Sequence, residues 1–189
     1  MTKEKSKIVL LDRDGVINED SDNYIRSVEE WIPITSSIEA IARLHQNNYQ
    51  VYVITNQSGI GRGYYSLETL AGMHKKMNNL IEQAGGKVSD IAFCPHTPDA
   101  QCECRKPKTG LLQKIAKDHN LDLTGVPFIG DSLTDIQCAH RAGANGILVK
   151  TGKGLRTLEK AKHSEEAASA LQNVPVFDNL AQFVDHFLE

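Results

Sequence analysis

Three of the chain's four cysteines and a histidine lie together in residues 94–107, the stretch CPHTPDAQCECRKP, which we call the cysteine loop. Cys94, His96, Cys102 and Cys104 are soft or borderline ligands, and four of them fill the coordination sphere of a structural Zn²⁺. In a reducing compartment, a tight cysteine cluster is more often a metal site than a set of disulfides. We therefore expect a small zinc-binding loop, with buried free thiols as the alternative. A catalytic zinc is not expected, because such sites keep one position open.

Acids and hydroxyls follow three short apolar, β-branched runs, at the point where each run ends. Asp12 and Asp14 follow residues 8–11, Thr55 and Ser58 follow residues 51–54, and Asp131 and Ser132 follow residues 126–129. Any one of these groups could be a helix cap or a turn. Ligands of parallel sheets bind beyond the carboxyl ends of the strands, so we expect the groups to converge there. Converging carboxylates repel one another, and a cation with all-oxygen ligands at an open site is typically Mg²⁺.

An α/β fold must position these side chains. Short apolar runs alternate with segments of helical period, which predicts a doubly wound, Rossmann-like parallel sheet with helices on both faces and right-handed crossovers. The expected strands are residues 8–11, 51–54, 91–93, 126–129 and 147–149. Proline is disfavoured inside a central strand, so Pro127 fits the strand expected at residues 126–129 if it takes the first position.

Helices are expected between these strands. A capping box at residues 36–39 should open the first helix, whose apolar face carries Ile38, Ile41, Ala42 and Leu44. The other expected helices follow Ser66 to about Gln83, span residues 109–119 and 134–142, and form the carboxy-terminal tail at 180–188. Cys138, the isolated cysteine, is expected to be a small buried core residue.

Length and composition limit the class of protein. The 189 residues suit one domain, 1–189, and a composition of 40% hydrophobic and 24% charged residues is ordinary for a globular protein. A formal net charge of −3 gives no basic surface for nucleic acid. No apolar run approaches the roughly 20 residues that span a bilayer, and residues 1–7 lack the apolar core of a signal peptide. We expect a cytoplasmic protein with no nucleic-acid or membrane partner.

Four segments resemble, in order, the four motifs of the haloacid dehalogenase superfamily phosphatases. They are residues 11–16, residues 55–56, residues 105–107 and residues 130–135, and the resemblance covers about residues 8–150. It implies hydrolysis of a phosphate monoester through an aspartyl-phosphate on Asp12. It also implies that Asp14 is the general acid and base, that Thr55 donates to the transferring phosphoryl group, and that Lys106 balances charge on the phosphoryl oxygens and Asp12.

The resemblance extends to the metal and its surroundings. It implies that Mg²⁺ is held by the carboxylates of Asp12 and Asp131 and by the main-chain carbonyl of Asp14. For Asp135, one helical turn after Asp131, two interpretations stay open: a partner for Lys106, or a first-turn acid favoured by the helix dipole.

Within the superfamily, residues 12–18, residues 53–63 and the cysteine loop most closely resemble the sugar bisphosphate phosphatases that remove the C7 phosphate of D-glycero-D-manno-heptose 1,7-bisphosphate. These enzymes act in ADP-heptose and lipopolysaccharide core synthesis. The histidinol-phosphate phosphatases, with a closely similar zinc loop, are the alternative. The resemblance suggests a monomer whose partner is a small phosphorylated sugar. It places substrate contacts at Arg13, Asp20, Asn56, Gln57, Ser58, Arg105, Lys106 and Ser132.

No large cap domain is evident between the motifs, so two loops remain to enclose a substrate. Zinc in the cysteine loop would fix Arg105 and Lys106 as a preorganised phosphate clamp. The alternating glycines of residues 59–63 predict a flexible loop, in which Arg62 is either a substrate contact or a solvated surface arginine. A third class of function, a zinc loop that docks nucleic acid or protein through Arg105, Lys106 and Lys108, fits poorly with the acidic net charge and the acids at the strand ends.

Overall fold

Six parallel strands form one sheet in this computed structural model, which describes residues 7–189. The strands are β1 Ile8–Leu11, β2 Gln50–Asn56, β3 Asp90–Cys94, β4 Pro127–Gly130, β5 Asn145–Val149 and β6 Val176–Phe177. The five expected strands are confirmed, and Pro127 takes the first position of its strand. The two-residue β6 was not predicted, because it is too short to show a strand pattern. Our expectation for residues 1–7 falls, except for Lys7, outside the described residues.

Helices connect the strands. They are α1 Thr35–Gln46, α2 Ser58–Gly61, α3 Leu67–Gln83, α4 Gly110–His119, α5 Leu133–Arg141, α6 Gly154–Ala161, α7 Glu165–Ala170 and α8 Leu180–Leu188, with a single 3₁₀ turn, η1, at Pro98–Ala100. The helices α3, α4, α5 and α8 agree with the predicted bounds to within one residue, and Ser66 caps α3 by accepting from the amide of Thr69. The short helices α2, α6 and α7 were not predicted. None of the helices in the described part of the chain is both long and apolar enough to span a bilayer.

The capping box predicted at residues 36–39 was wrong. Ile34 rather than Ser36 precedes the first residue of helix α1, which therefore begins two residues earlier, and no side chain caps it. Ser37 is buried instead and donates to the main-chain carbonyl of Val16 at 2.7 Å. A buried hydroxyl needs an acceptor, and Ser37 finds one on a distant loop that local sequence cannot show. The apolar face predicted for this helix is buried, as expected.

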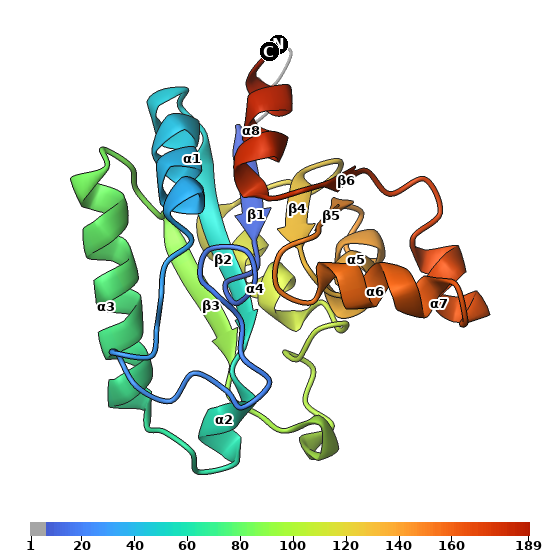
Figure 1. Cartoon of the computed structure of the whole chain (residues 1–189), viewed down its shortest axis with the longest axis horizontal. Coiled ribbons are helices and arrows are strands. Elements are labelled where there is room, and N and C mark those ends of the chain that lie inside the picture. Colours follow the sequence, from blue (N-terminus) through green and yellow to red (C-terminus); the bar gives the residue numbers. More distant parts are fainter. Residues whose placement is uncertain (1–6) are drawn as a thin grey trace.

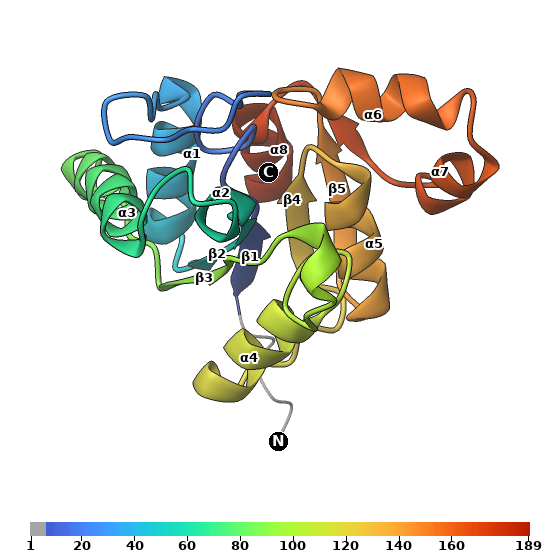
Figure 2. The same cartoon turned by 90° about the horizontal axis from the view of Figure 1, so that it is seen from below.

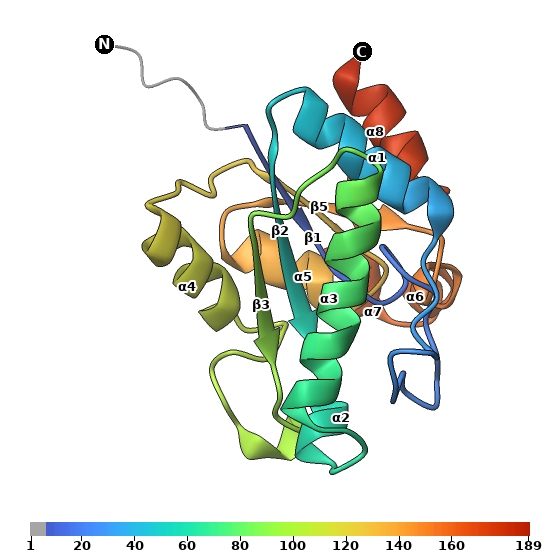
Figure 3. The same ribbon diagram turned by 90° about the vertical axis from the view of Figure 1, so that its left-hand side faces the viewer.

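The sheet has a hydrophobic core on each face. Val9 and Leu11 of β1 pack in one core with α1, α3 and α8, whereas Ile8 and Leu10 pack in the other with α4 and α5. Figures 2 and 3 show α4 on the opposite side of the sheet from α1 and α3. Because both faces are covered, each strand is a continuous apolar run. Cys138 is buried in the second core, as predicted.

The strand order fixes where a ligand can bind. The order β3-β2-β1-β4-β5-β6 runs outward in two directions from β1 and β4, so these neighbours form the topological switch point. The amide of Asp12 donates to the carbonyl of Ile129 at 2.9 Å, which joins the two strand ends directly. In Figure 1 the strands point downward, and α2 and the loop that follows β1 lie at the lower edge. No segment of residues 7–189 forms a separate cap domain over this edge.

Candidate active site

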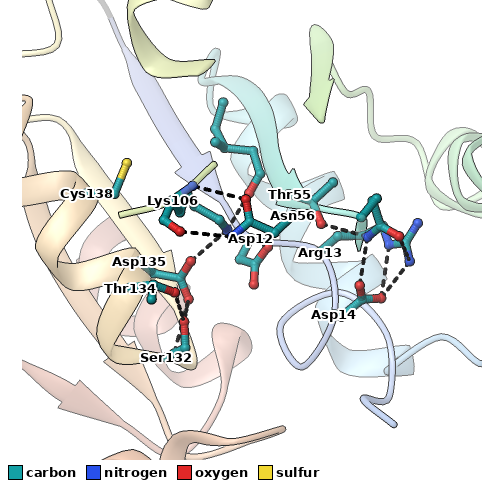
Figure 4. A network of polar contacts seen from close by, with 12 residues as sticks. Asp12, Arg13, Asp14, Thr55, Asn56, Lys106, Ser132, Thr134, Asp135 and Cys138 are labelled. Carbon is teal, nitrogen blue, oxygen red and sulfur yellow. Dashed lines mark hydrogen bonds and ion pairs between the residues drawn. The ribbon is translucent and has the colours of Figure 1, made fainter. Parts of the chain in front are cut away.

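A cavity of about 350 Å³ opens at this edge of the sheet. Every residue that we predicted for catalysis, magnesium binding or substrate binding lines it, with the exception of Arg13. The side chains that follow β1, β2 and β4 therefore do converge, as the rule for strand ends predicts. Figure 4 shows the polar contacts among many of them.

Three carboxylates and one ammonium group form the centre of the cavity. One oxygen from each of Asp12, Asp131 and Asp135 lies within 4.8 Å of the other two. Lys106 Nζ lies 2.8 Å from Asp12 Oδ1 and 2.6 Å from Asp135 Oδ1. Burial raises the pKa of Asp12 to about 7, against the attraction of Lys106, and burial and Asp12 raise that of Asp131 to about 8. Two negative charges stay uncompensated when all three acids ionise, which fits a divalent cation between Asp12 and Asp131.

Lys106 is held rigidly. Its ammonium group donates to Asp12 and, at 2.7 Å, to the carbonyl of Ile54, and it forms an ion pair with Asp135. The side chain of Asn56 accepts from the Lys106 amide and donates to the Lys106 carbonyl, so it fixes the backbone as well. Burial on its own would lower the pKa of Lys106, but Asp12 and Asp135 raise it overall. The lysine therefore stays charged at physiological pH.

Asp135 combines both of the interpretations that the sequence left open. Its Oδ1 pairs with Lys106, and its Oδ2 accepts from the amide and the hydroxyl of Ser132 at 3.1 and 2.6 Å. The side chain is fully buried. Gly130 leaves the room for it, because a Cβ there would lie 2.3 Å from the Asp135 Cβ. Asp135 is thus the residue that sets the position of Lys106 against Asp12.

Arg13 takes a different role from the substrate contact that we predicted. It is fully buried, and its Nε and Nη2 donate to Asp14 Oδ1 at 3.0 and 2.7 Å. Asn18 Nδ2 donates to the same oxygen at 2.9 Å. Burial alone would raise the pKa of Asp14, but Arg13, Asn18 and Gln57 outweigh it and lower the pKa. Arg13 therefore supports the carboxylate form of Asp14 from behind the cavity wall.

Gln57 also has no free group for the substrate contact that we predicted. Its Nε2 donates to Asp14 Oδ2 at 2.8 Å and to Thr55 Oγ1 at 2.9 Å. Its Oε1 accepts from Tyr65 at 2.6 Å and from Arg13 at 3.2 Å. A glutamine amide has two N–H donors and two lone pairs, so these four bonds use its whole capacity. Although Gln57 lines the cavity, its contacts are to the protein.

The loop between β5 and α6 contributes a cation that sequence reasoning missed. Lys153 lines the cavity, its amide donates to Asp131 Oδ2 at 2.7 Å, and its ammonium group lies 3.0 Å from Asp20. Gly152 has φ +56°, and a Cβ there would lie 2.2 Å from Asp131 Oδ2. The loop follows a predicted strand, so the rule that identified Asp12 and Asp131 would also have pointed to Lys153.

Residues 19–26 form one side of the cavity mouth. Besides the pair between Asp20 and Lys153, contacts to α6 and to Tyr64 hold this segment in place. Asp22 pairs with Arg156 of α6 at 2.8 Å, and the ring of Tyr24 packs against that of Tyr64 with centroids 5.1 Å apart. Arg62 is exposed, and its guanidinium carbon lies 6.0 Å from the centroid of the Tyr24 ring. The tyrosines of this mouth were not among the predicted site residues.

The glycine-rich segment, residues 59–63, was predicted to be a flexible loop, but its first part is helical. Residues Ser58–Gly61 form the helix α2, and the amide of Gly61 donates to the carbonyl of Pro95 in the cysteine loop at 2.9 Å. A Cβ at Gly61 would lie 2.7 Å from that carbonyl oxygen. The glycine thus allows α2 to pack closely against the cysteine loop.

The four metal ligands predicted in the cysteine loop face one another. The sulfurs of Cys94, Cys102 and Cys104 lie 3.1–3.6 Å apart, and His96 Nδ1 lies 3.6 Å from Cys94 and 3.2 Å from Cys104. A tetrahedral Zn²⁺ with zinc–sulfur bonds of about 2.3 Å separates its sulfurs by about 3.8 Å, so the cluster fits such an ion. Arg105 donates to the carbonyl of His96 at 3.2 Å, which ties this cation to a predicted ligand.

Comparisons with known proteins give the same class of enzyme. A sequence profile of the HAD-hydrolase-like family matches residues 103–183. The chain is 48% identical to the D-glycero-β-D-manno-heptose-1,7-bisphosphate 7-phosphatase of Pseudomonas aeruginosa, over 96% of this chain and 98% of that protein. It is 45% identical to the protein of the same name from Neisseria meningitidis, over 97% of this chain and 95% of that protein.

A solved structure is similar over the same length. The D,D-heptose 1,7-bisphosphate phosphatase of Bordetella bronchiseptica, crystallised with magnesium and phosphate, has a TM-score of 0.88 at 43% identity, covering 96% of this chain and 98% of that chain. The similarity thus extends well beyond the four motifs.

Proposed function

This chain belongs to the heptose 1,7-bisphosphate 7-phosphatase family of haloacid dehalogenase-like hydrolases, and on that premise we propose that it removes the C7 phosphate of D-glycero-β-D-manno-heptose 1,7-bisphosphate. This reaction belongs to ADP-heptose synthesis for the lipopolysaccharide core. The observation that carries the proposal is the placement of Asp12, Lys106 and Asp131 together at the topological switch point of the sheet. The similarity to heptose 1,7-bisphosphate 7-phosphatases supports the choice of substrate. Relatives at 45–50% identity are named for the β-anomer, whereas one named for the α-anomer is 35% identical.

In the first step, a carboxylate oxygen of Asp12 attacks phosphorus and the bond from phosphorus to the C7 oxygen breaks. The electron pair of that bond goes to the C7 oxygen, which takes a proton from Asp14. Mg²⁺, when held by Asp12 and Asp131 and by the Asp14 carbonyl, supplies positive charge to the phosphoryl oxygens. Lys106 favours the ionised form of Asp12 against the effect of burial, because its ammonium group lies 2.8 Å from the attacking carboxylate.

In the second step, Asp14 accepts a proton from a water whose oxygen attacks phosphorus. The bond from phosphorus to Asp12 breaks, which releases inorganic phosphate and returns the Asp12 carboxylate. The low pKa of Asp14 suits this role, since the carboxylate form is the base. The first step needs the protonated form, and an anionic phosphate nearby raises the pKa of a carboxyl group. Thr55 Oγ1 accepts from Gln57, so its own proton stays available for a phosphoryl oxygen.

The second phosphate of the proposed substrate requires a cation away from Lys106. Arg105 lines the cavity, and its bond to the His96 carbonyl leaves the charge of the guanidinium uncompensated there. An anionic group at the far end of the substrate therefore fits this site better than the ammonium group of histidinol phosphate. We propose that Arg105 contacts that phosphate.

The proposal predicts the preference between two substrates. With Mg²⁺ present, we expect kcat/KM for heptose 1,7-bisphosphate to exceed that for histidinol phosphate by roughly 10- to 150-fold, since a lost phosphate–arginine contact costs roughly 1.5–3 kcal/mol. Phosphate release measured for both substrates checks this. Equal values, or a preference for histidinol phosphate, would establish the alternative instead.

We also propose that the cysteine loop binds a structural Zn²⁺, in a monomeric protein of the cytoplasm. The support is the geometry of the four side chains, which face one another: Cys94, His96, Cys102 and Cys104. The three cysteines are free thiols and form no disulfide. A reducing cytosol keeps such thiols available as ligands. Through the bond from Arg105 to the His96 carbonyl, zinc would fix the direction of the guanidinium.

Removing one ligand should separate zinc from the rest of the fold. Wild type is expected to hold one zinc per chain by elemental analysis, and Cys102→Ser to lose it together with several kcal/mol of unfolding free energy, because zinc binding contributes on the order of 10 kcal/mol. Cys138→Ala, which changes the buried cysteine outside the loop, should keep the zinc. A Cys102→Ser protein with no zinc but full activity would rule out a zinc-positioned Arg105.

A further inference from the structure

We propose that Tyr65 and Gln57 form a hydrogen-bonded relay that positions Asp14 for proton transfer to the leaving group. This inference rests on the proposed phosphatase function, because it assigns a task to residues behind its acid and base. Tyr65 lies in the connection between α2 and α3 and lines the cavity. It donates to Gln57, which in turn donates to Asp14.

The direction of each bond in this relay is fixed by Arg13. A guanidinium group only donates, so the Gln57 atom 3.2 Å from Arg13 Nη2 must be the amide oxygen. The same oxygen lies 2.6 Å from the Tyr65 hydroxyl, which therefore acts as a donor. The amide nitrogen then has to face Asp14 Oδ2, at 2.8 Å. Rotation of the amide by half a turn would place N–H groups against a guanidinium and an oxygen against a carboxylate.

The two oxygens of Asp14 are not equivalent. Oδ1 accepts from Arg13 Nε, from Arg13 Nη2 and from Asn18, which exceeds its two lone pairs. Oδ2 accepts from Gln57 alone among the described side chains, and so keeps a lone pair. The proton exchanged with the leaving group is therefore held at Oδ2, and Gln57 sets where that lone pair points.

Gly59 gives Tyr65 its place in the relay. A Cβ at Gly59 would lie 2.2 Å from Cε1 of Tyr65 and 3.0 Å from its hydroxyl oxygen, so any other residue would displace the ring. Burial raises the pKa of Tyr65 to about 12, which keeps the hydroxyl protonated as the donor that the geometry requires. The absence of a side chain at Gly59 thus allows Tyr65 to reach Gln57, which in turn holds Asp14.

The relay predicts an effect that depends on the leaving group. A sugar alkoxide needs a proton to depart, whereas the phenolate of an activated aryl phosphate does not. Tyr65→Phe keeps the ring against Gly59 and removes only the hydroxyl. We expect it to lower kcat/KM for heptose 1,7-bisphosphate roughly 10- to 100-fold, a part of the 100- to 10,000-fold that a general acid contributes. The value for the aryl phosphate should change less than about twofold.

The chain contains a matched control. Tyr52 donates to Gln50 Oε1 at 3.1 Å, the same kind of bond, on the β2 strand away from the cavity. Tyr52→Phe should leave both kcat/KM values unchanged. A Tyr65→Phe protein with equal losses on both substrates, or with no loss on either, would overturn the proposed relay.

A double variant tests whether Tyr65 acts through Gln57. Gln57→Leu should show the same dependence on the leaving group, and Tyr65→Phe with Gln57→Leu should be no worse than Gln57→Leu alone. Losses that multiply would contradict a single relay. If Gln57→Leu does not fold, the leaving-group comparison with Tyr65→Phe decides. If wild type hydrolyses the aryl phosphate but not the heptose substrate, the proposed function is wrong. The relay can then be tested separately, by comparing the aryl phosphate with an alkyl phosphate that the enzyme hydrolyses.

Discussion

Asp12→Asn is expected to lower phosphate release by at least about 10⁴-fold, the scale seen when an enzyme loses the nucleophile of a covalent mechanism. An asparagine has nearly the shape of the carboxylate but no ionised oxygen to attack phosphorus. Lys106 holds Asp12 Oδ1 at 2.8 Å, and Asp135 holds Lys106, so the surroundings of the asparagine should stay in place. The loss should therefore appear in kcat, with substrate binding much less affected.

Phosphate release and equilibrium binding of heptose 1,7-bisphosphate, both measured in Mg²⁺, separate these effects. Asp178→Asn serves as the control, because Asp178 is an exposed acid that pairs with Lys150 outside the cavity. It should retain the wild-type rate. If Asp12→Asn kept more than about a tenth of the wild-type rate, the aspartyl-phosphate mechanism would be wrong.

Lys106→Met is expected to lower the stability of the fold strongly. It leaves three buried or nearly buried acids, Asp12, Asp131 and Asp135, within 4.8 Å of one another with no cation among them. Removing one partner of a buried ion pair costs about 3–5 kcal/mol, because the remaining charge is unpaired. The free energy of unfolding of the metal-free protein should fall by that amount, and added Mg²⁺ should restore a part of it.

Urea unfolding with and without Mg²⁺ measures this change. Lys108→Met is the matched control, because Lys108 is two residues away and its ammonium group forms an exposed pair with Glu103 and an exposed hydrogen bond to the carbonyl of Gln101. Exposed pairs contribute about 0–1 kcal/mol, so its effect should be small. Equal stabilities for the two variants would mean that Lys106 does not hold the acids together, and would contradict the charge balance described for the site.

Much of the fold could be predicted because both faces of the sheet are covered. Continuous apolar runs such as residues 8–11 are distinctive, and Gly143, with φ +75°, lies just past the end of α5 in the left-handed conformation that commonly terminates helices. The capping of α1 could not be predicted, because Ser37 bonds to Val16 on a distant loop. Local sequence carries no information about an acceptor that only the folded chain brings near.

The candidate site, like the fold, could be predicted from the sequence only in part. The carboxylates follow from the rule for strand ends, because their positions depend only on strand order. The roles of Arg13 and Gln57 depend on side-chain direction, and both donate to Asp14. Motif membership gives the position of a residue in the sequence but not what it contacts. Lys153 was not predicted, because the loop after the fifth strand carries no carboxylate like those that follow the first and fourth strands.

The identity of the phosphate that leaves tests the central claim most directly. Purified protein in Mg²⁺ is given D-glycero-β-D-manno-heptose 1,7-bisphosphate, and the products are followed by phosphorus NMR. The account predicts inorganic phosphate and heptose 1-phosphate, with the anomeric phosphate intact. Release of the anomeric phosphate, or no release while histidinol phosphate is hydrolysed, would contradict it.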